Sequence, residues 1–286
     1  MGRDINPAND SKASLPDNAC LLAQRVLVPI ANPSNENNLL NLALILSKAV
    51  NGTLLPIHVL CDRTSPINTE AISQQKQLLA AAEEIAHSAN ATVEIIGKVD
   101  DAVDRGIVRA AIERQASLII CGWKGFSSYE ENLFGGVIDN LAAKAIIPVL
   151  IGRFAQPIAN TARIFLAVTK KQALSAEFNS TLDVAKVLAT ELKASLQVTV
   201  ILSKKQAELS SAKIGELGQD VFIAQSQGNF VRQVCRKIHR NDLVILATNT
   251  SNQRTNSRSA VGKLAESIAR SQSTTSVLVI HFPDNY

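Results

Sequence analysis

The chain has 286 residues, of which 46% are apolar and 19% charged, and its formal net charge is +4. This composition indicates a globular protein with a sizeable core, and the length predicts two domains. No apolar run reaches the eighteen residues of a membrane-crossing helix, so we expect no membrane insertion. The basic residues are dispersed and aromatic residues make up only 4% of the chain. Nucleic acid is therefore not an expected partner.

The four cysteines argue against a metal or disulfide framework. Cys20, Cys61, Cys121 and Cys235 are far apart and form no C-x-x-C pair, which favours a reducing cytoplasm. Residues 1–23 lack a basic start followed by an apolar region, and we interpret them as a polar N-terminal lead-in.

The first half alternates between strand-like and helix-like patterns. This alternation predicts an α/β fold with a doubly wound parallel sheet. We expect strands over 25–31, 52–60, 91–99, 117–122 and 147–151, and helices over 39–50, 66–90, 102–115 and 137–145.

The second half repeats this order. IVRAAIERQASLIICG in the first half matches FVRQVCRKIHRNDLVILAT in the second, and a similarity at a spacing of roughly 125 residues indicates a tandem duplication. We expect strands over 163–168, 195–202, 221–226, 242–248 and 275–282, and helices over 173–192, 229–239 and 260–269.

The repeat suggests where the domains begin and end. We predict a first domain at 24–152, a linker at 153–161 that includes FAQPIAN, and a second domain at 162–286. Each domain should hold about five parallel strands around its own sheet. The apolar last strands, IPVLI and TSVLVI, should pack the two halves together as a pseudo-dimer, because an exposed strand edge invites pairing.

Four glycines follow the apolar run that ends at residue 122. Gly122, Gly125, Gly135 and Gly136 lie between a strand and a helix, and ligands of open parallel sheets bind at the carboxyl ends of strands near the point where strand order reverses. Glycine lets the backbone approach a ligand, and the amides of a helix N-terminus attract phosphate. The pattern therefore favours a nucleotide site.

The spacing Gly122-x2-Gly125-x9-Gly135-Gly136 resembles the G-x2-G-x9-G-[S/T] signature of the universal stress protein family. RVLVPI, PIHVL and IPVLI are similar to the first, second and fifth strands of that family, and the resemblance covers nearly all of both halves. It implies a tandem protein of two universal stress protein domains of the adenine nucleotide alpha hydrolase-like type. QRVLVPIANPSNENNLLNLALIL is also similar to the cytoplasmic tail of cation:proton antiporters, particularly cyanobacterial ones.

The resemblance implies that the first domain binds an adenine nucleotide, which could be ATP, ADP or AMP. The implied contact residues are Ala31, Val59, Gly122, Gly125, Gly135, Gly136 and Val137. Two of them depart from the family's pattern: Ala31 replaces an aspartate that contacts the adenosine part, and Gly136 replaces a hydroxyl residue. Glu130 and Glu131 also lie in the loop, where they would repel phosphates, and Lys124 could partly offset them. We therefore expect AMP or ADP to bind within tenfold of ATP.

The second half departs further from the pattern. Its loop reads NTSNQRTNSRSAVG, and Thr169 stands where the family has the first-strand aspartate. We expect no nucleotide site of the family type there. Arg254 and Arg258 could hold an anion, although a solvated polar loop is the other interpretation.

Several features have structural interpretations beside the functional ones. The glycines could only permit a tight connection in a protein that has lost its ligand, Trp123 could cover the pocket or pack over the loop, and Cys121 fits a small core residue better than a reactive thiol. Neither the histidines nor Ser127 and Ser128 show a motif for metal binding or nucleophilic catalysis. The histidines are His58, His87, His239 and His281.

These observations leave three hypotheses for function. The first is a cytoplasmic, non-enzymatic regulatory module that responds to an adenine nucleotide, with a homodimer or a membrane antiporter as partner. The second is slow ATP hydrolysis, for which the sequence offers no placed base and no Walker lysine. The third is a structural dimerisation module with a vestigial loop.

Overall fold

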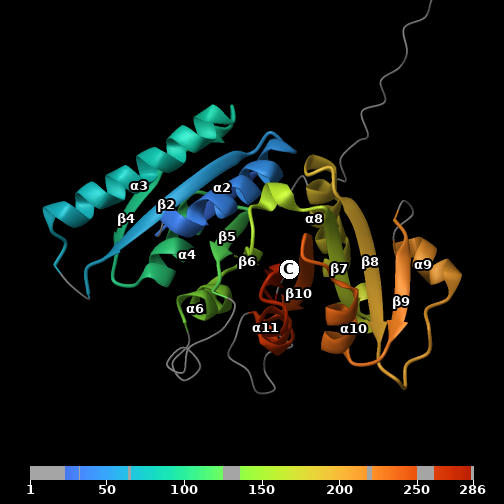
Figure 1. Ribbon diagram of the computed structural model, residues 1–286. Helices are drawn as coiled ribbons and strands as arrows, with labels where there is room; N and C mark the ends of the chain where they lie inside the picture. Colours follow the sequence, from blue (N-terminus) through green and yellow to red (C-terminus); the bar gives the residue numbers. More distant parts are fainter. Residues whose placement is uncertain are drawn as a thin grey trace, which may run out of the picture.

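The computed structural model describes residues 23–31, 33–63, 66–124, 136–217, 221–249 and 261–284 (Figure 1). The expected lead-in therefore lies outside the described residues except for Ala23, which is buried. Within the described ranges, no helix combines the length and the apolar character that crossing a membrane requires.

The first half follows the expected alternation of strands and helices. Its elements are β1 (Arg25–Pro29), α2 (Pro33–Lys48), β2 (Thr53–Cys61), α3 (Thr69–Ser88), β3 (Thr92–Val93), β4 (Ile96–Asp100), α4 (Val103–Glu113), β5 (Leu118–Gly122), α6 (Val137–Lys144) and β6 (Val149–Arg153).

The second half follows after the short 3-10 helix η1 (Ile158–Asn160). Its elements are β7 (Arg163–Thr169), α7 (Lys170–Ala173), α8 (Glu177–Glu191), β8 (Ser195–Leu202), α9 (Ser211–Leu217), β9 (Ile223–Gln227), α10 (Phe230–Lys237), β10 (Asp242–Asn249), α11 (Gly262–Ser271) and β11 (Ser276–Phe282).

Both halves use the same strand order. In the first half β2 lies between β1 and the pair β3 and β4, and β5 and β6 lie on the other side of β1. The second half repeats this order as β9-β8-β7-β10-β11, and all pairs within each half are parallel. The predicted tandem of doubly wound parallel units is therefore confirmed.

The two halves join through their last strands, β6 and β11. These strands pair antiparallel, with Ile151 opposite Val279 and Leu150 opposite Ile280. The expected pairing of IPVLI with TSVLVI is thus present. The expectation of two separate sheets is wrong, because backbone hydrogen bonding between the two edge strands merges the described strands into one eleven-stranded sheet.

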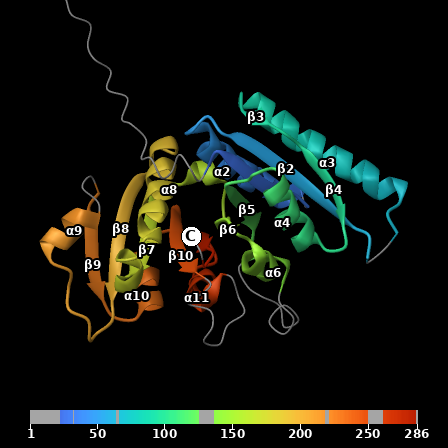
Figure 2. The same cartoon turned by 180° about the vertical axis from the view of Figure 1, so that it is seen from behind.

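Helices cover both faces of this sheet (Figures 1 and 2). One apolar core lies between the sheet and α2, α3 and α8, and the other lies between the sheet and α4, α6, α10 and α11. Leu150 and Leu278 belong to the first core and Ile151 and Val279 to the second, so both cores continue across the join. The strands are apolar on both faces for this reason.

Three segments differ from the expected elements. The strand expected over 91–99 divides into β3 and β4 around Glu94, whose carboxylate pairs with Arg25 at 2.9 Å and with Arg114. The helix expected over 173–192 begins only at Glu177 as α8, and the short helix α7 precedes it at 170–173. Helix α9 was not expected.

The segment predicted as a linker is packed against the first half. Ile158 of η1 is 2% exposed, and its backbone N–H donates to Oδ1 of Asn38 in α2 at 3.0 Å. The connection between the halves is therefore held in place by side-chain contacts as well as by the strand pairing.

Candidate functional site

The strand order of the first half reverses between β1 and β5. From β1 the chain continues to β2 on one side, whereas β5 pairs with β1 on the other side. Such a point is where open parallel sheets bind ligands, at the carboxyl ends of the strands. Ala31 follows β1 and is exposed, and Gly122 is the last residue of β5. The fold thus brings these two predicted residues to the carboxyl ends of neighbouring strands.

Gly122 stands where a side chain would crowd the first core. A Cβ atom at this position would lie 3.2 Å from Cδ1 of Leu39 in α2, a distance at which Leu39 would have to shift. The end of β1 is fixed on the other side, because the Ile30 N–H donates to the Ile57 carbonyl at 2.8 Å and His58 Nδ1 lies 2.7 Å from the Ile30 carbonyl oxygen. His58 therefore positions the strand end that precedes Ala31.

Val59 lies further from the reversal point, in β2. Its side chain is half-buried and packs against the core under α4. There it faces Gly106, at which a Cβ atom would come within 2.6 Å of Val59 Cγ1. A ligand at the strand ends would therefore meet the backbone of Val59.

Gly136 and Val137 form the start of helix α6. Gly136 is the N-cap residue, and Val137 is 50% exposed. The Gly136 N–H donates to Oδ2 of Asp139 at 3.3 Å. Because a phosphate would need the same amide, a nucleotide in this position has to displace the Asp139 carboxylate.

The remaining residues of the glycine loop lie outside the described residues. These are Gly125 and Gly135 of the predicted site, together with Glu130 and Glu131. Trp123 precedes them, and its N–H donates to the Gly152 carbonyl at 2.8 Å. Its side chain packs against the core under α4 and α6. Lys124 is exposed.

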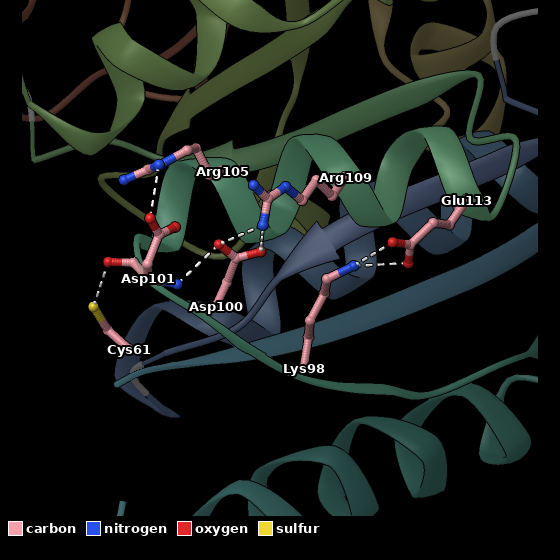
Figure 3. Close-up of polar contacts among 7 residues, drawn as sticks. All are labelled: Cys61, Lys98, Asp100, Asp101, Arg105, Arg109 and Glu113. Carbon is pink, nitrogen blue, oxygen red and sulfur yellow. Dashed lines mark hydrogen bonds and ion pairs between the residues drawn. The ribbon is translucent and has the colours of Figure 1, made fainter. Parts of the chain in front are cut away.

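A cluster of ion pairs lies between β4 and α4 (Figure 3). Asp100, whose side chain is 2% exposed, accepts hydrogen bonds from Nη1 of Arg109 at 2.9 and 3.1 Å and from the Asp101 N–H at 2.9 Å. Burial alone raises the pKa of Asp100, but the hydrogen bonds and the Arg109 charge outweigh it and lower the pKa below its usual range.

Three further ion pairs fix helix α4. Lys98 of β4 binds both carboxylate oxygens of Glu113 at 2.7 Å, and Arg105 pairs with Asp101 at 2.7 Å. Lys144 at the end of α6 pairs with Asp104 in the first turn of α4. Sequence reasoning did not identify this cluster. The sequence does contain a pattern that could have indicated it. Asp100 and Asp101 end a strand, and cations follow them at helical spacing.

The equivalent point of the second half, between β7 and β10, is bridged by a side chain. Thr169, which stands where the family pattern has an aspartate, caps α7 by accepting from the Gln172 N–H at 3.3 Å. Gln172 Oε1 accepts from the Thr169 N–H at 2.8 Å, and Gln172 Nε2 donates to the Ala247 carbonyl of β10 at 2.5 Å. Gln172 therefore spans the two strand ends at which a ligand would enter.

The described cysteines and carboxylates do not form a second chemical centre. Burial raises the pKa of Cys121 to about 12, and Cys61 Sγ donates to the Asp101 carbonyl at 3.2 Å. Across the described ranges, no group of three or more His, Cys, Asp or Glu side chains is placed to hold a metal ion.

The first half of the chain is similar to a known protein family. Residues 23–153 match the model of the universal stress protein family. The first half is therefore similar to universal stress proteins. A universal stress protein from Archaeoglobus fulgidus DSM 4304 has a similar fold over both halves. It is 16% identical to this chain with a TM-score of 0.66, over 93% of this chain and 99% of that chain.

Two comparisons concern membrane transporters. The Na(+)/H(+) antiporter NhaS5 of Synechocystis is 30% identical over 132 residues, which are 45% of this chain and 19% of the antiporter. The chain thus matches about a fifth of that relative's length. The cytoplasmic domain of a prokaryotic cation chloride cotransporter has a TM-score of 0.57 at 12% identity, over 90% of this chain and 94% of that domain.

Some of the similar solved structures contain a nucleotide. A universal stress protein from Archaeoglobus fulgidus was solved in complex with dAMP. It is 21% identical to this chain with a TM-score of 0.39, over 46% of this chain and 98% of that chain.

Proposed function

We propose that the chain is a regulatory module that binds an adenine nucleotide in its first domain and transmits the bound state to a cation:proton antiporter. The nucleotide lies at the carboxyl ends of β1 and β5, with Ala31, Gly122 and the backbone of Val59 on the adenosine side. Gly136 and Val137 at the start of α6 contact the phosphates, together with Gly125 and Gly135 of the preceding loop. The module performs no enzymatic step.

The proposal rests on a difference between the two places at which the strand order reverses. These places lie between β1 and β5 in the first half and between β7 and β10 in the second half. In the first half, Ala31 is exposed and Gly122 has no side chain. In the second half, Gln172 donates across the gap to Ala247. Among the described residues, a side chain thus bridges the strand ends in the second half, whereas Ala31 and Gly122 stand at the strand ends in the first half. This asymmetry supports one nucleotide per chain.

The antiporter as target is supported by two similarities. A stretch of 132 residues of this chain is 30% identical to part of an antiporter, and 90% of the chain shares its fold with the cytoplasmic domain of a cotransporter. The proposed module is therefore cytoplasmic and acts on its transporter by favouring one arrangement of the joined halves. Such control requires that the nucleotide binds one arrangement more tightly than the other.

Isothermal titration calorimetry with AMP, ADP and ATP tests the nucleotide site. We expect one site per chain. Gly135→Leu should abolish binding, because a bulky side chain blocks the approach of phosphate to the backbone. Arg254→Ala in the second-half loop is the matched control and should bind normally. Both substitutions lie outside the described residues.

The other hypotheses predict different results. A structural module with a vestigial loop would bind none of the three nucleotides, and native mass spectrometry of the purified protein would show no co-purified nucleotide. A slow ATPase would release phosphate at a rate that Gly135→Leu abolishes. Two equivalent sites per chain would contradict the assignment of the nucleotide to the first domain.

A further inference from the structure

The two halves of the chain carry opposite charge. Residues 24–152 contain 10 Lys and Arg against 13 Asp and Glu, a net charge of −3. Residues 153–286 contain 17 Lys and Arg against 9 Asp and Glu, a net charge of +8. The overall charge of +4 therefore conceals a strongly basic second half, and such asymmetry is typical of a surface that meets an anionic partner.

The cations around helix α4 in the first half are neutralised by neighbouring carboxylates. Arg109 pairs with Asp100, Arg105 with Asp101, and Lys98 with Glu113. These pairs leave little net charge on this helix to attract a partner.

Helix α10 is the repeat of α4 but lacks those carboxylates. In the matched sequences, Arg232 stands at the position of Arg109, and Arg236 replaces Glu113. Strand β4 ends with Asp100, whereas β9 ends with Gln227, which is followed by Gly228. The second half has thus kept the arginine of this position, while one neighbouring carboxylate is replaced by an amide and another by a second arginine.

Helix α11 packs beside α10 and extends this charge. We define the basic face as Arg232 and Arg236 of α10, Arg240, which follows it, and Lys263 and Arg270 of α11. All five are exposed. Arg270 forms an ion pair with Glu266 of the same helix at 4.0 Å.

The inner sides of both helices show that the basic face points away from the sheet. Val234 of α10 and Ala265 and Ile268 of α11 are buried in the core beneath them. Leu264, which neighbours Lys263, is 44% exposed. At helical spacing, Lys263 and Arg270 lie opposite the buried residues of α11, and the accessible Leu264 lies at the flank between the two sides.

We propose that the basic face docks on the surface of a bilayer that contains anionic phospholipids. Guanidinium groups bind phosphate oxygens in pairs of parallel hydrogen bonds, and juxtamembrane cations are attracted by the negative surface potential of such bilayers. Leu264, at the flank of α11, enters the headgroup region beside the cations. A single-stranded nucleic acid fits less well, because Phe230, the aromatic residue of α10, packs against the core and offers no surface for base stacking.

Co-sedimentation of the full chain with vesicles tests this docking, and it does not depend on the nucleotide site. The vesicles are pure phosphatidylcholine or phosphatidylcholine with phosphatidylglycerol. We expect the protein to bind the mixed vesicles that contain phosphatidylglycerol and not the pure phosphatidylcholine vesicles. Binding should weaken as the salt concentration rises. The double substitution Arg232→Gln and Arg236→Gln should weaken binding about tenfold or more, given the attraction per cation near such a surface.

The matched control removes two exposed lysines from another part of the second half. Lys204→Gln with Lys205→Gln lowers the net charge equally and should keep binding within about twofold of wild type. Leu264→Ser, which changes no charge, should also weaken binding.

Three results would overturn the proposal. The first is the absence of binding to phosphatidylglycerol vesicles, and the second is an equal loss in both double variants, which would show that net charge alone matters. The third is displacement from the vesicles by duplex DNA at an equal concentration of phosphate, which would identify nucleic acid as the better partner. Thermal unfolding of each variant confirms that it is folded.

Discussion

Val59 of β2 and Gly106 of α4 lie in direct contact, and the contact leaves no room for a methyl group. A Cβ atom on Gly106 would lie 2.6 Å from Cγ1 of Val59 and 3.1 Å from Cβ of Asp100. Helix α4 therefore packs closely on the strand that carries a predicted nucleotide contact.

Gly106→Ala should destabilise the protein, although alanine favours helices more than glycine does. We expect the free energy of unfolding to fall by about 1–3 kcal/mol, because an added methyl group in a filled core forces neighbours to move. The control is Gly215→Ala in α9, where a Cβ atom would meet nothing within 4 Å. That change should be neutral or stabilise by up to about 1 kcal/mol. Urea unfolding measures both, and equal effects of the two changes would contradict the packing described.

Asp100 should make the stability depend on acidic pH. Its pKa is lowered in the folded protein, so its contribution is present above the unfolded value of about 3.9 and is lost as the pH falls through the folded value. Asp100→Asn should lower the melting temperature at pH 7 and flatten its decline below about pH 4. Calorimetric scans across this range test the expectation, and a parallel acid decline in wild type and variant would refute it.

Asp139→Ala should affect stability and nucleotide affinity in opposite directions. Removing the carboxylate that accepts from Gly136 should cost about 0.5–2 kcal/mol of unfolding free energy. It should also tighten nucleotide binding several-fold, because it frees the amide and removes a negative charge near the phosphates. Asp139→Asn separates the two effects, since it removes the charge but keeps an acceptor. Unchanged affinity in both variants would place the phosphates elsewhere.

AMP or ADP should bind within tenfold of ATP, a difference below about 1.4 kcal/mol. Ala31 offers no carboxylate to the adenosine, Gly136 offers no hydroxyl to the phosphates, and Glu130 and Glu131 repel added negative charge. Side-by-side titrations at fixed magnesium and ionic strength measure the difference. ATP that binds a hundredfold more tightly than AMP would contradict this prediction.

Cys121 should not react with thiol reagents in the folded protein. Its side chain is buried, and burial raises its pKa to about 12, so very little thiolate forms near neutral pH. A variant with serine at Cys20, Cys61 and Cys235 isolates this thiol. Labelling should be slow in buffer and stoichiometric in denaturant, and fast labelling of the folded variant would show that the strand end opens.

Periodicity in the sequence was sufficient to predict most of the fold. Long apolar runs such as SLIICG and TSVLVIHF predicted buried strands correctly, because they are covered on both faces. Helix α9 was missed, since seven residues with the sequence SAKIGEL carry too little periodic signal. The merging of the two sheets was also missed. A strand's sequence shows that its edge is apolar but does not show which strand will pair with it.

The candidate site was predictable only where a residue acts through local geometry. Glycine spacing and the end of β1 predicted the positions of Gly122 and Ala31. The bridge from Gln172 to Ala247 was not predictable, because it joins residues 75 positions apart and depends on the α7 cap that turns the Gln172 side chain toward β10. In the sequence, nothing distinguishes Gln172 from any other polar residue that follows a strand.

The antiparallel pair of β6 and β11 has a consequence for assembly at low concentration. Two separate domains would associate according to their abundance in the cell, whereas covalent connection gives the two edges a high local concentration that dilution does not change. The pairing persists in a cell that contains very few copies of the chain. Because β11 pairs with β6, the second half also covers a strand edge of the first half that would otherwise be open to pairing with other chains.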